Sequence, residues 1–168
     1  MKKKLTLIRH AKSSWGNPHL PDYERVLNER GQGDAVRMGK ALQQRDINFE
    51  RVLCSSATRA RETLNLLREQ LVIEEDAIDY LDDLYCASVA TLINIIQQAD
   101  NSKTDLAIIA HNPGLEELAA HLTKDAKTFS TCTVMQIEFE IDSWRQIDET
   151  HGQQSIFLSP KTLQEGAD

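Results

Sequence analysis

The side chains near the amino terminus best suited to chemistry are those of Arg9 and His10, which directly follow a short apolar run over residues 5–8. A guanidinium binds phosphate oxygens through paired hydrogen bonds, and an imidazole can act as a nucleophile. The run is typical of a buried strand, and ligand sites in α/β proteins gather at the carboxyl ends of strands. An isolated Arg-His pair is usually a surface feature, so its meaning depends on what accompanies it.

A second histidine follows a second apolar run. Residues 105–110 form that run, and His111, Pro113 and Gly114 come after it. Proline suits the first turn of a helix and glycine permits close backbone approach, and the apolar residues over 113–123 have helical spacing. We therefore expect His10 and His111 to lie at the ends of two strands of one sheet. Either histidine alone is more often structural, whereas the two together favour a functional site.

The start of a helix supplies the third element. Val52–Cys54 are typical of a short strand, Ser55 or Ser56 is a candidate N-cap, and a helix is predicted to continue to about residue 70. Arg59 falls in the first turn, where the helix terminus already favours an anion. Arg61 is offset from it by about 200° on a helical wheel, so we expect Arg61 to be a solvated surface side chain.

Together these motifs resemble the histidine phosphatase superfamily, also called the phosphoglycerate mutase-like superfamily. The motifs are Arg9-His10-Ala11, Ser55-Ser56-Ala57-Thr58-Arg59-Ala60-Arg61-Glu62-Thr63 and His111-Asn112-Pro113-Gly114. The closer likeness is to its SixA-type phosphohistidine phosphatase branch, through the segments 9–15, 27–31 and 111–115. The resemblance extends from Lys4 to about Trp144 and departs at Ala11, Val26 and Ser56, where relatives often carry glycine, proline and proline. None of these departures removes a candidate catalytic group.

The resemblance implies an α/β fold with three layers, α/β/α, around a mostly parallel central sheet. We expect one histidine phosphatase domain over residues 1–168, because the length, the 40% hydrophobic content and the 27% charged content are ordinary for one globular domain. Residues 11–27 are predicted to form a long loop and Asn28 to cap a helix, while Ser88 is predicted to cap another. Alternation over 134–141 indicates a half-buried strand, Trp144 is expected to begin a further extended segment, and residues 155–158 are a candidate strand.

The resemblance also implies a metal-independent phosphatase with no cofactor. His10 would attack phosphorus and form a phosphohistidine, and Arg9, Arg59 and His111 would surround the phosphoryl oxygens, where positioning and electrostatic stabilisation do most of the catalysis. His10 must be neutral to attack, and we expect His111 to be protonated at least transiently.

Three further side chains are candidates for substrate binding. Lys12 and Ser14 could reach the phosphate from the segment after His10, and Asn112 could form hydrogen bonds beside His111. Trp15 is a candidate for the wall of the site entrance or for closing the core.

A general acid for the leaving group is harder to find. Asp22, Asp82 and Asp83 are the candidates, although each would more often be a solvated surface carboxylate. An imidazole leaving group has a pKa of about 6.5 and departs far more readily than an alkoxide, so it needs less help from an acid. The lack of an obvious acid therefore suits a phosphohistidine substrate.

Composition limits the compartments and partners. The net charge of −7 argues against nucleic-acid binding, no segment is apolar enough to span a membrane, and no secretory signal pattern is present. Cys54, Cys86 and Cys132 are too widely spaced for a zinc motif, and we expect all three to be reduced packing residues. These observations predict a cytoplasmic protein that binds neither nucleic acid nor membrane.

Three classes of function stay open. The first is a phosphatase that acts on a phosphorylated substrate presented by a histidine-containing phosphotransfer domain. The second is a small-molecule phosphomonoesterase of the same superfamily, or a mutase, for which this short chain has little material to shelter a phosphoenzyme from water. The third is a catalytically silent phosphoprotein-binding module, against which the complete set of two arginines and two histidines counts.

Overall fold

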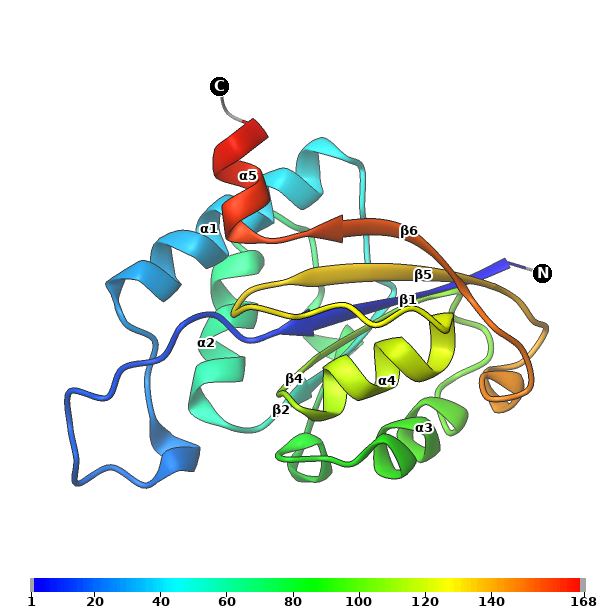
Figure 1. The fold of residues 1–168 in the computed structure, drawn as a ribbon, viewed down its shortest axis with the longest axis horizontal. Coiled ribbons are helices and arrows are strands. Elements are labelled where there is room, and N and C mark those ends of the chain that lie inside the picture. Colours follow the sequence, from blue (N-terminus) through cyan, green and yellow to red (C-terminus); the bar gives the residue numbers. More distant parts are fainter. Residues whose placement is uncertain (1, 167–168) are drawn as a thin grey trace.

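A single mixed sheet forms the middle of the molecule (Figure 1). The computed structural model describes residues 2–166, so Met1 and residues 167–168 at the ends of the expected domain lie outside the described residues. The strands are β1 (Lys2–Arg9), β2 (Arg51–Ser55), β3 (Ile78–Leu81), β4 (Asp105–Ala110), β5 (Val134–Glu140) and β6 (Gln153–Leu158). Their order is β3-β2-β4-β1-β5-β6, and β3, β2, β4 and β1 pair in parallel while β5 pairs antiparallel with both neighbours.

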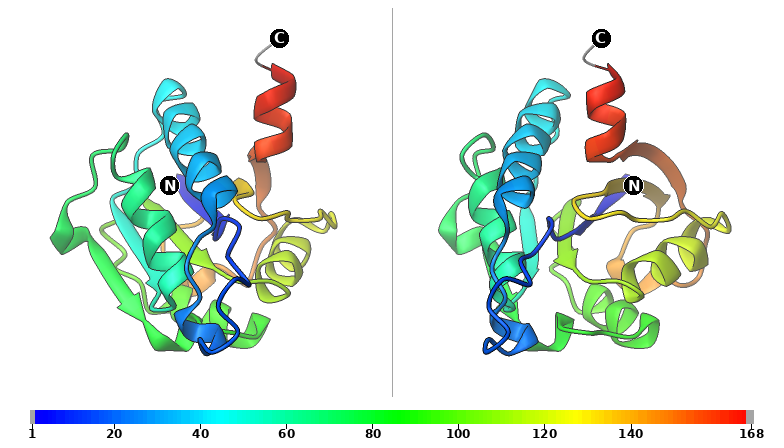
Figure 2. Two further views of the ribbon diagram at one scale, coloured as in Figure 1. Left: turned by 90° about the vertical axis from the view of Figure 1, so that its left-hand side faces the viewer. Right: turned by 60° about the vertical axis from the view of Figure 1, so that its left-hand side comes forward.

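Helices cover both faces of the sheet. They are α1 (Glu29–Gln44), α2 (Thr58–Leu67), α3 (Val89–Gln97), α4 (Gly114–Thr123) and α5 (Pro160–Gly166), with short 3-10 turns η1 (Asp22–Glu24), η2 (Glu75–Ala77), η3 (Asp82–Leu84) and η4 (Trp144–Gln146). Figure 2 shows α1 and α2 on one side of the sheet and α4 on the other. The apolar core likewise consists of two clusters of buried side chains. Helices α1, α2 and α5 contribute to one cluster, and α3 and α4 contribute to the other. The predicted three-layer α/β/α fold with a mostly parallel sheet is confirmed.

Strand β1 lies inside the sheet because its side chains are apolar on both faces. Leu5, Leu7 and Ile8 are fully buried, which is the pattern of a strand covered by helices on both sides. In the parallel pairing with β4, Arg9 lies opposite Ala110, and the His10 amide donates to the Ala110 carbonyl at 3.2 Å. This register brings the residues that follow both strands to the same place.

Several predicted boundaries hold. Asn28 and Ser88 cap α1 and α3 through side-chain hydrogen bonds, and the strands at 105–110 and 155–158 are present. Gly114 packs as expected, since a Cβ there would lie 2.3 Å from the carbonyl oxygen of Ala87. Across the part of the chain that the structure describes, no helix is long and apolar enough to cross a membrane.

Other local predictions were wrong. Ala57 rather than Ser55 or Ser56 occupies the N-cap of α2, because both serine hydroxyls form hydrogen bonds with residues from other segments. Trp144 begins a 3-10 turn instead of an extended segment, since a capping box between Ser143 and Gln146 closes the turn.

The cysteines divide into two groups. Cys54 and Cys132 are buried, as predicted for packing residues, and burial raises the pKa of each thiol to about 12. Cys86 was predicted wrongly, because it is exposed on the loop that follows η3 and has a φ of 55°.

Gly31 sets how closely α1 approaches the segment after β1. A Cβ at Gly31 would lie 2.1 Å from the carbonyl oxygen of Lys12 and 2.9 Å from its amide nitrogen, whereas a Cβ at Gly33 would have its nearest neighbour at 3.6 Å. The Lys12 carbonyl also accepts the Asn28 amide at 3.0 Å. Helix α1 and the His10 segment are therefore fixed to each other by backbone contact.

We predict that Gly31→Ala lowers the free energy of unfolding by roughly 1–3 kcal/mol, the usual cost of overpacking. Gly33→Ala is the matched control in the same helix and should be neutral or stabilising by up to about 1 kcal/mol, because alanine is the better helix former. Urea unfolding of both variants measures the difference. Equal stability of the two variants would contradict the close contact at Gly31.

Candidate active site

His10 lies just beyond the carboxyl end of β1 and is only 6% exposed. Its Nδ1 atom is 2.7 Å from the carbonyl oxygen of Ala11, so Nδ1 carries the hydrogen and donates it. The other ring nitrogen, Nε2, accepts a long hydrogen bond of 3.3 Å from Nε of Arg59. This arrangement leaves the lone pair of Nε2 as the nucleophilic position of the ring.

His111 follows β4 and lies beside His10, with ring centroids 5.1 Å apart. Its Nε2 atom is 2.8 Å from the hydroxyl of Ser55, while its Nδ1 atom is buried and has no hydrogen-bond partner within residues 2–166. The Ser55 oxygen also accepts the Ala57 amide at 3.3 Å, which leaves the hydroxyl hydrogen available to His111. If Ser55 donates to Nε2, the imidazole hydrogen is on Nδ1, and neutral His111 can donate to an anion.

The two histidines border a cavity of about 270 Å³, called the histidine cavity below. Three arginines border it with them, and the complete lining consists of Arg9, His10, Lys12, Ser13, Trp15, Arg25, Arg59, Cys86, His111, Asn112 and Thr131. All four predicted catalytic residues are therefore brought together. Three guanidiniums around one small space form a site for a highly charged anion such as a phosphoryl group.

All three arginines are held by neighbouring carbonyl or carboxylate groups. Arg9 donates from Nη1 to the Phe129 carbonyl at 2.8 Å. Arg59 lies in the first turn of α2, and its two Nη atoms contact the carbonyl oxygen and the carboxylate of Asp22 at 2.6 and 3.1 Å. These contacts hold the guanidiniums in place before any anion binds.

Arg25 is the basic residue that sequence reasoning missed. It is 9% exposed, its Nε atom donates to Asp22 at 3.1 Å, and its Nη1 atom is buried without a partner in the described chain. The sequence placed it in a long loop and offered no periodicity to orient it. The only sequence feature that points to Arg25 is its position two residues before Leu27, in the segment that leads to Asn28, the N-cap of α1.

Two of the three predicted substrate-binding residues line the histidine cavity, and one does not. Lys12 and Asn112 line the histidine cavity, and the Asn112 amide group donates to the carbonyl of Phe129 at 2.9 Å. Ser14 is not among the lining residues, because its hydroxyl accepts the Gly16 amide at 3.0 Å, and Ser13 lines the cavity instead. Strand-like pairing of Ser13 with Leu27 explains the difference, since neighbouring side chains then point to opposite sides.

Asp22 is held as a carboxylate. It accepts hydrogen bonds from the Tyr85 hydroxyl, from Arg59 and from Arg25. The Tyr85 hydrogen bond and the nearby Arg59 guanidinium lower the pKa of Asp22 to about 2. An acid of this strength is ionised at neutral pH and is therefore a poor proton donor to a leaving group.

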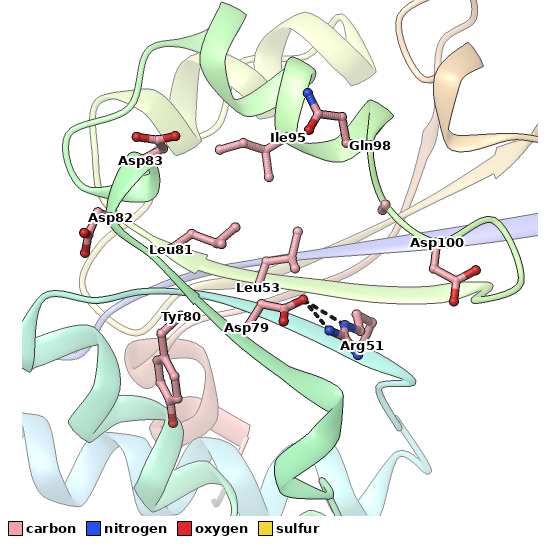
Figure 3. A pocket seen from close by; sticks show the side chains of 11 residues that line it. Arg51, Leu53, Asp79, Tyr80, Leu81, Asp82, Asp83, Ile95, Gln98 and Asp100 are labelled. Carbon is pink, nitrogen blue, oxygen red and sulfur yellow. Dashed lines mark hydrogen bonds and ion pairs between the residues drawn. The ribbon is translucent and has the colours of Figure 1, made fainter.

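The other two candidate acids border a second, larger cavity, of about 700 Å³ (Figure 3). Figure 3 shows Asp82 and Asp83 at one end of it and Asp100 at the other, with the Arg51–Asp79 ion pair between them. Asp82 accepts hydrogen bonds from Ser56 and, at 3.4 Å, from Tyr23. Neither carboxylate lines the histidine cavity.

Burial makes both histidines weak bases. Desolvation, with Arg59 and Arg9 nearby, lowers the pKa of His10 to about 4, and desolvation, with His10 and Arg59 nearby, lowers the pKa of His111 to about 3. At neutral pH, with no anion bound, both imidazoles are uncharged. His10 therefore needs no base to become a nucleophile, and His111 can donate from Nδ1 without first gaining a proton when the Ser55 hydroxyl donates to its Nε2 atom.

The remaining histidines lie away from the site. His19 and His151 are exposed, and His121 forms an ion-pair contact with Asp148 on the surface. Within residues 2–166, no group of three or more His, Cys, Asp or Glu side chains is arranged to hold a metal ion. Arg61 is exposed as predicted, with its guanidinium 4.5 Å from the centroid of the Tyr80 ring.

Comparisons with known proteins show the family to which the chain belongs. The family model of the histidine phosphatase superfamily, branch 1, matches residues 5–102. An uncharacterized chloroplastic protein of Arabidopsis thaliana is 30% identical over 154 residues, which cover 86% of this chain and 70% of the relative.

Solved structures show the same fold. The protein histidine phosphatase SixA complexed with tungstate has a TM-score of 0.82 at 22% identity, and the match covers 95% of this chain and 99% of that one. A structure assigned to a phosphohistidine phosphatase SixA from Nakamurella multipartitia has a TM-score of 0.83 at 19% identity, covering 95% and 97% of the two chains.

The lowered pKa values predict an unusual titration of His10. Its imidazole signal in a proton NMR titration should have a midpoint near pH 4 rather than near the ordinary 6.5. His10→Gln assigns the signal by its loss, and His19→Gln, at an exposed site, is the matched control. A midpoint near 6.5 for the signal lost in His10→Gln would contradict the burial of this ring.

The same shift links pH to stability. Between about pH 6.5 and pH 4 the unfolded chain binds a proton at His10 that the folded chain does not bind, so the free energy of unfolding falls as pH falls through this window. His10→Gln should therefore lose less stability than the wild type between pH 7 and pH 4. Urea unfolding at the two pH values measures this difference, and identical losses would contradict the prediction.

Proposed function

Because the chain belongs to the histidine phosphatase superfamily, branch 1, we propose that it is a phosphatase that carries the phosphoryl group on His10 and passes it to water. The observation that carries the proposal is the unprotonated Nε2 atom of His10 in a cavity that it shares with three arginines and His111. The tungstate bound by the SixA protein of the same fold is a tetrahedral oxyanion like phosphate, which also supports an anion site here.

The first step is an in-line displacement. The Nε2 lone pair of His10 forms a bond to phosphorus as the bond from phosphorus to the leaving group breaks, and the bonding electrons go with that group. Arg9, Arg59 and the Nδ1 hydrogen of His111 contact the equatorial oxygens, where negative charge concentrates in the transition state. His10 keeps its Nδ1 hydrogen on the Ala11 carbonyl, so the phosphorylated ring carries a positive charge.

The second step returns the ring to its starting state. A water molecule attacks phosphorus from the side that the first leaving group vacated, and the phosphorus–Nε2 bond breaks. The positive ring accepts this electron pair and becomes neutral imidazole, so it leaves without a further proton. Inorganic phosphate takes the water oxygen and its remaining hydrogen, and the second proton goes to solvent.

The proposed substrate is a phosphohistidine on a histidine-containing phosphotransfer domain. Asp22 is ionised and neither Asp82 nor Asp83 lines the histidine cavity, so a leaving group that departs without strong acid assistance fits best. We further propose that the reaction uses no metal ion, since the arginines can supply the positive charge. The proposed compartment is the cytoplasm, where the free cysteines would stay reduced.

His10→Ala should abolish turnover of a phosphohistidine protein, with a loss of about a thousandfold or more, the scale of removing a nucleophile. It should also abolish labelling of the enzyme by a radioactive phosphodonor. His121→Ala, a surface histidine, is the matched control and should keep both. Labelling of His10→Ala at another residue, or turnover within tenfold of wild type, would contradict the assignment of His10 as the nucleophile.

Leaving-group dependence separates the proposed substrate from a phosphomonoester. Wild-type kcat/KM should be much higher for phosphohistidine than for an alkyl phosphate. Asp82→Asn and Asp83→Asn should barely change the rate on phosphohistidine, and any loss in Asp22→Asn should be similar for both substrates, because Asp22 positions the arginines. A loss of about a hundredfold or more that is confined to the alkyl phosphate would identify a general acid and favour the phosphomonoesterase.

A further inference from the structure

An exposed tryptophan stands at the mouth of the histidine cavity. Trp15 lines the cavity and yet is 77% exposed, whereas the other tryptophan, Trp144, is fully buried. Such an exposed indole contributes little to the stability of the core, so its packing does not explain its position. Ligand pockets are commonly lined by aromatic side chains, so the position of Trp15 favours a role in binding.

The indole is held in a fixed place by Arg25. The Arg25 guanidinium carbon lies 3.6 Å from the centroid of the Trp15 ring, which is the distance of a stacked cation–π pair. The Nε atom of Arg25 donates in turn to Asp22, which also binds Arg59. The orientation of Trp15 is therefore connected through two ion pairs to the arginine beside His10.

Arg25 also connects the indole to the anion. Its Nη1 atom is buried and has no partner among residues 2–166, although the residue lines the histidine cavity. A buried guanidinium hydrogen without an acceptor is costly, and a phosphoryl oxygen in the cavity would satisfy it. Arg25 would then contact both the anion and the Trp15 ring, so a group attached to the phosphate would have an aromatic side chain within reach.

The antiparallel pairing of the two segments explains how Arg25 reaches the indole. Ser13 pairs with Leu27 and the Ser14 amide donates to the Val26 carbonyl at 2.8 Å, so Trp15 and Arg25 lie on the same side of the paired segments. One face of the indole is covered by the Arg25 guanidinium, and the high exposure of Trp15 leaves the rest of the ring open. A flat apolar ring is the group that best fits an open indole face.

We propose that Trp15, oriented by Arg25, forms a subsite for a planar aromatic leaving group, so that the enzyme selects imidazolyl and aryl phosphates over alkyl phosphates by stacking. The inference rests on the proposed function, because it assigns the side chain that would recognise the phosphorylated imidazole. It adds a binding preference to the chemical preference for a good leaving group, and the two can be measured separately.

Non-hydrolysable phosphonates separate binding from chemistry. Isothermal titration calorimetry compares phenylphosphonate with cyclohexylphosphonate, which matches it in size but is not planar. Wild type should bind phenylphosphonate roughly three- to tenfold more tightly, the range expected for an aromatic pair. In Trp15→Ala the ratio of the two dissociation constants should fall to about one, and in Trp15→Phe most of the preference should be kept.

The control variant is Val72→Ala, which removes another exposed apolar side chain, 83% exposed. It should keep the wild-type ratio of the two dissociation constants. Equal affinity of wild type for the two phosphonates, or an unchanged preference in Trp15→Ala, would overturn the subsite. A protein that shows the phosphonate preference but hydrolyses no phosphohistidine would overturn the proposed function and leave the subsite standing.

Discussion

The site depends on the parallel pairing of β1 with β4. This pairing places Arg9 opposite Ala110 and joins the His10 amide to the Ala110 carbonyl, so the two histidines that follow the strands lie with ring centroids 5.1 Å apart. Strand side chains alternate between faces, and a slip of one residue would turn His10 or His111 to the opposite side of the sheet. The fully buried side chains of β1 and β4 fix the register because any slip would expose them or create cavities.

Burial at that sheet edge then sets the chemistry. Both imidazoles are largely buried, and this desolvation lowers the pKa of His10 to about 4 and that of His111 to about 3. The surrounding arginines keep their charge and are oriented by Asp22 and by backbone carbonyls. A neutral nucleophile surrounded by fixed cations needs little reorganisation when an anion arrives, which is the condition for electrostatic catalysis of phosphoryl transfer.

The sequence predicts the fold class through its family resemblance, and it predicts Arg9, His10 and His111 because an apolar run and the groups that follow it are local signals. Arg59 is predicted from its place in the first turn of a helix, and the structure brings all four side chains to one cavity. Arg25 was missed because its role comes from long-range contacts with Asp22 and Trp15, which no spacing encodes. The predicted N-cap serines of α2 were wrong because a serine hydroxyl can form a hydrogen bond either with a helix end or with a neighbouring segment. At Ser55 the hydroxyl contacts His111, which is far away in the sequence.

The central claim is that one anion site is formed by His10, the arginines and His111. A crystal structure with bound vanadate tests it most directly. We expect vanadium in line with Nε2 of His10, with oxygens contacting Arg9, Arg25, Arg59 and Nδ1 of His111. Vanadate bound elsewhere with this cavity empty, or bound to the arginines with His10 turned away, would contradict the account.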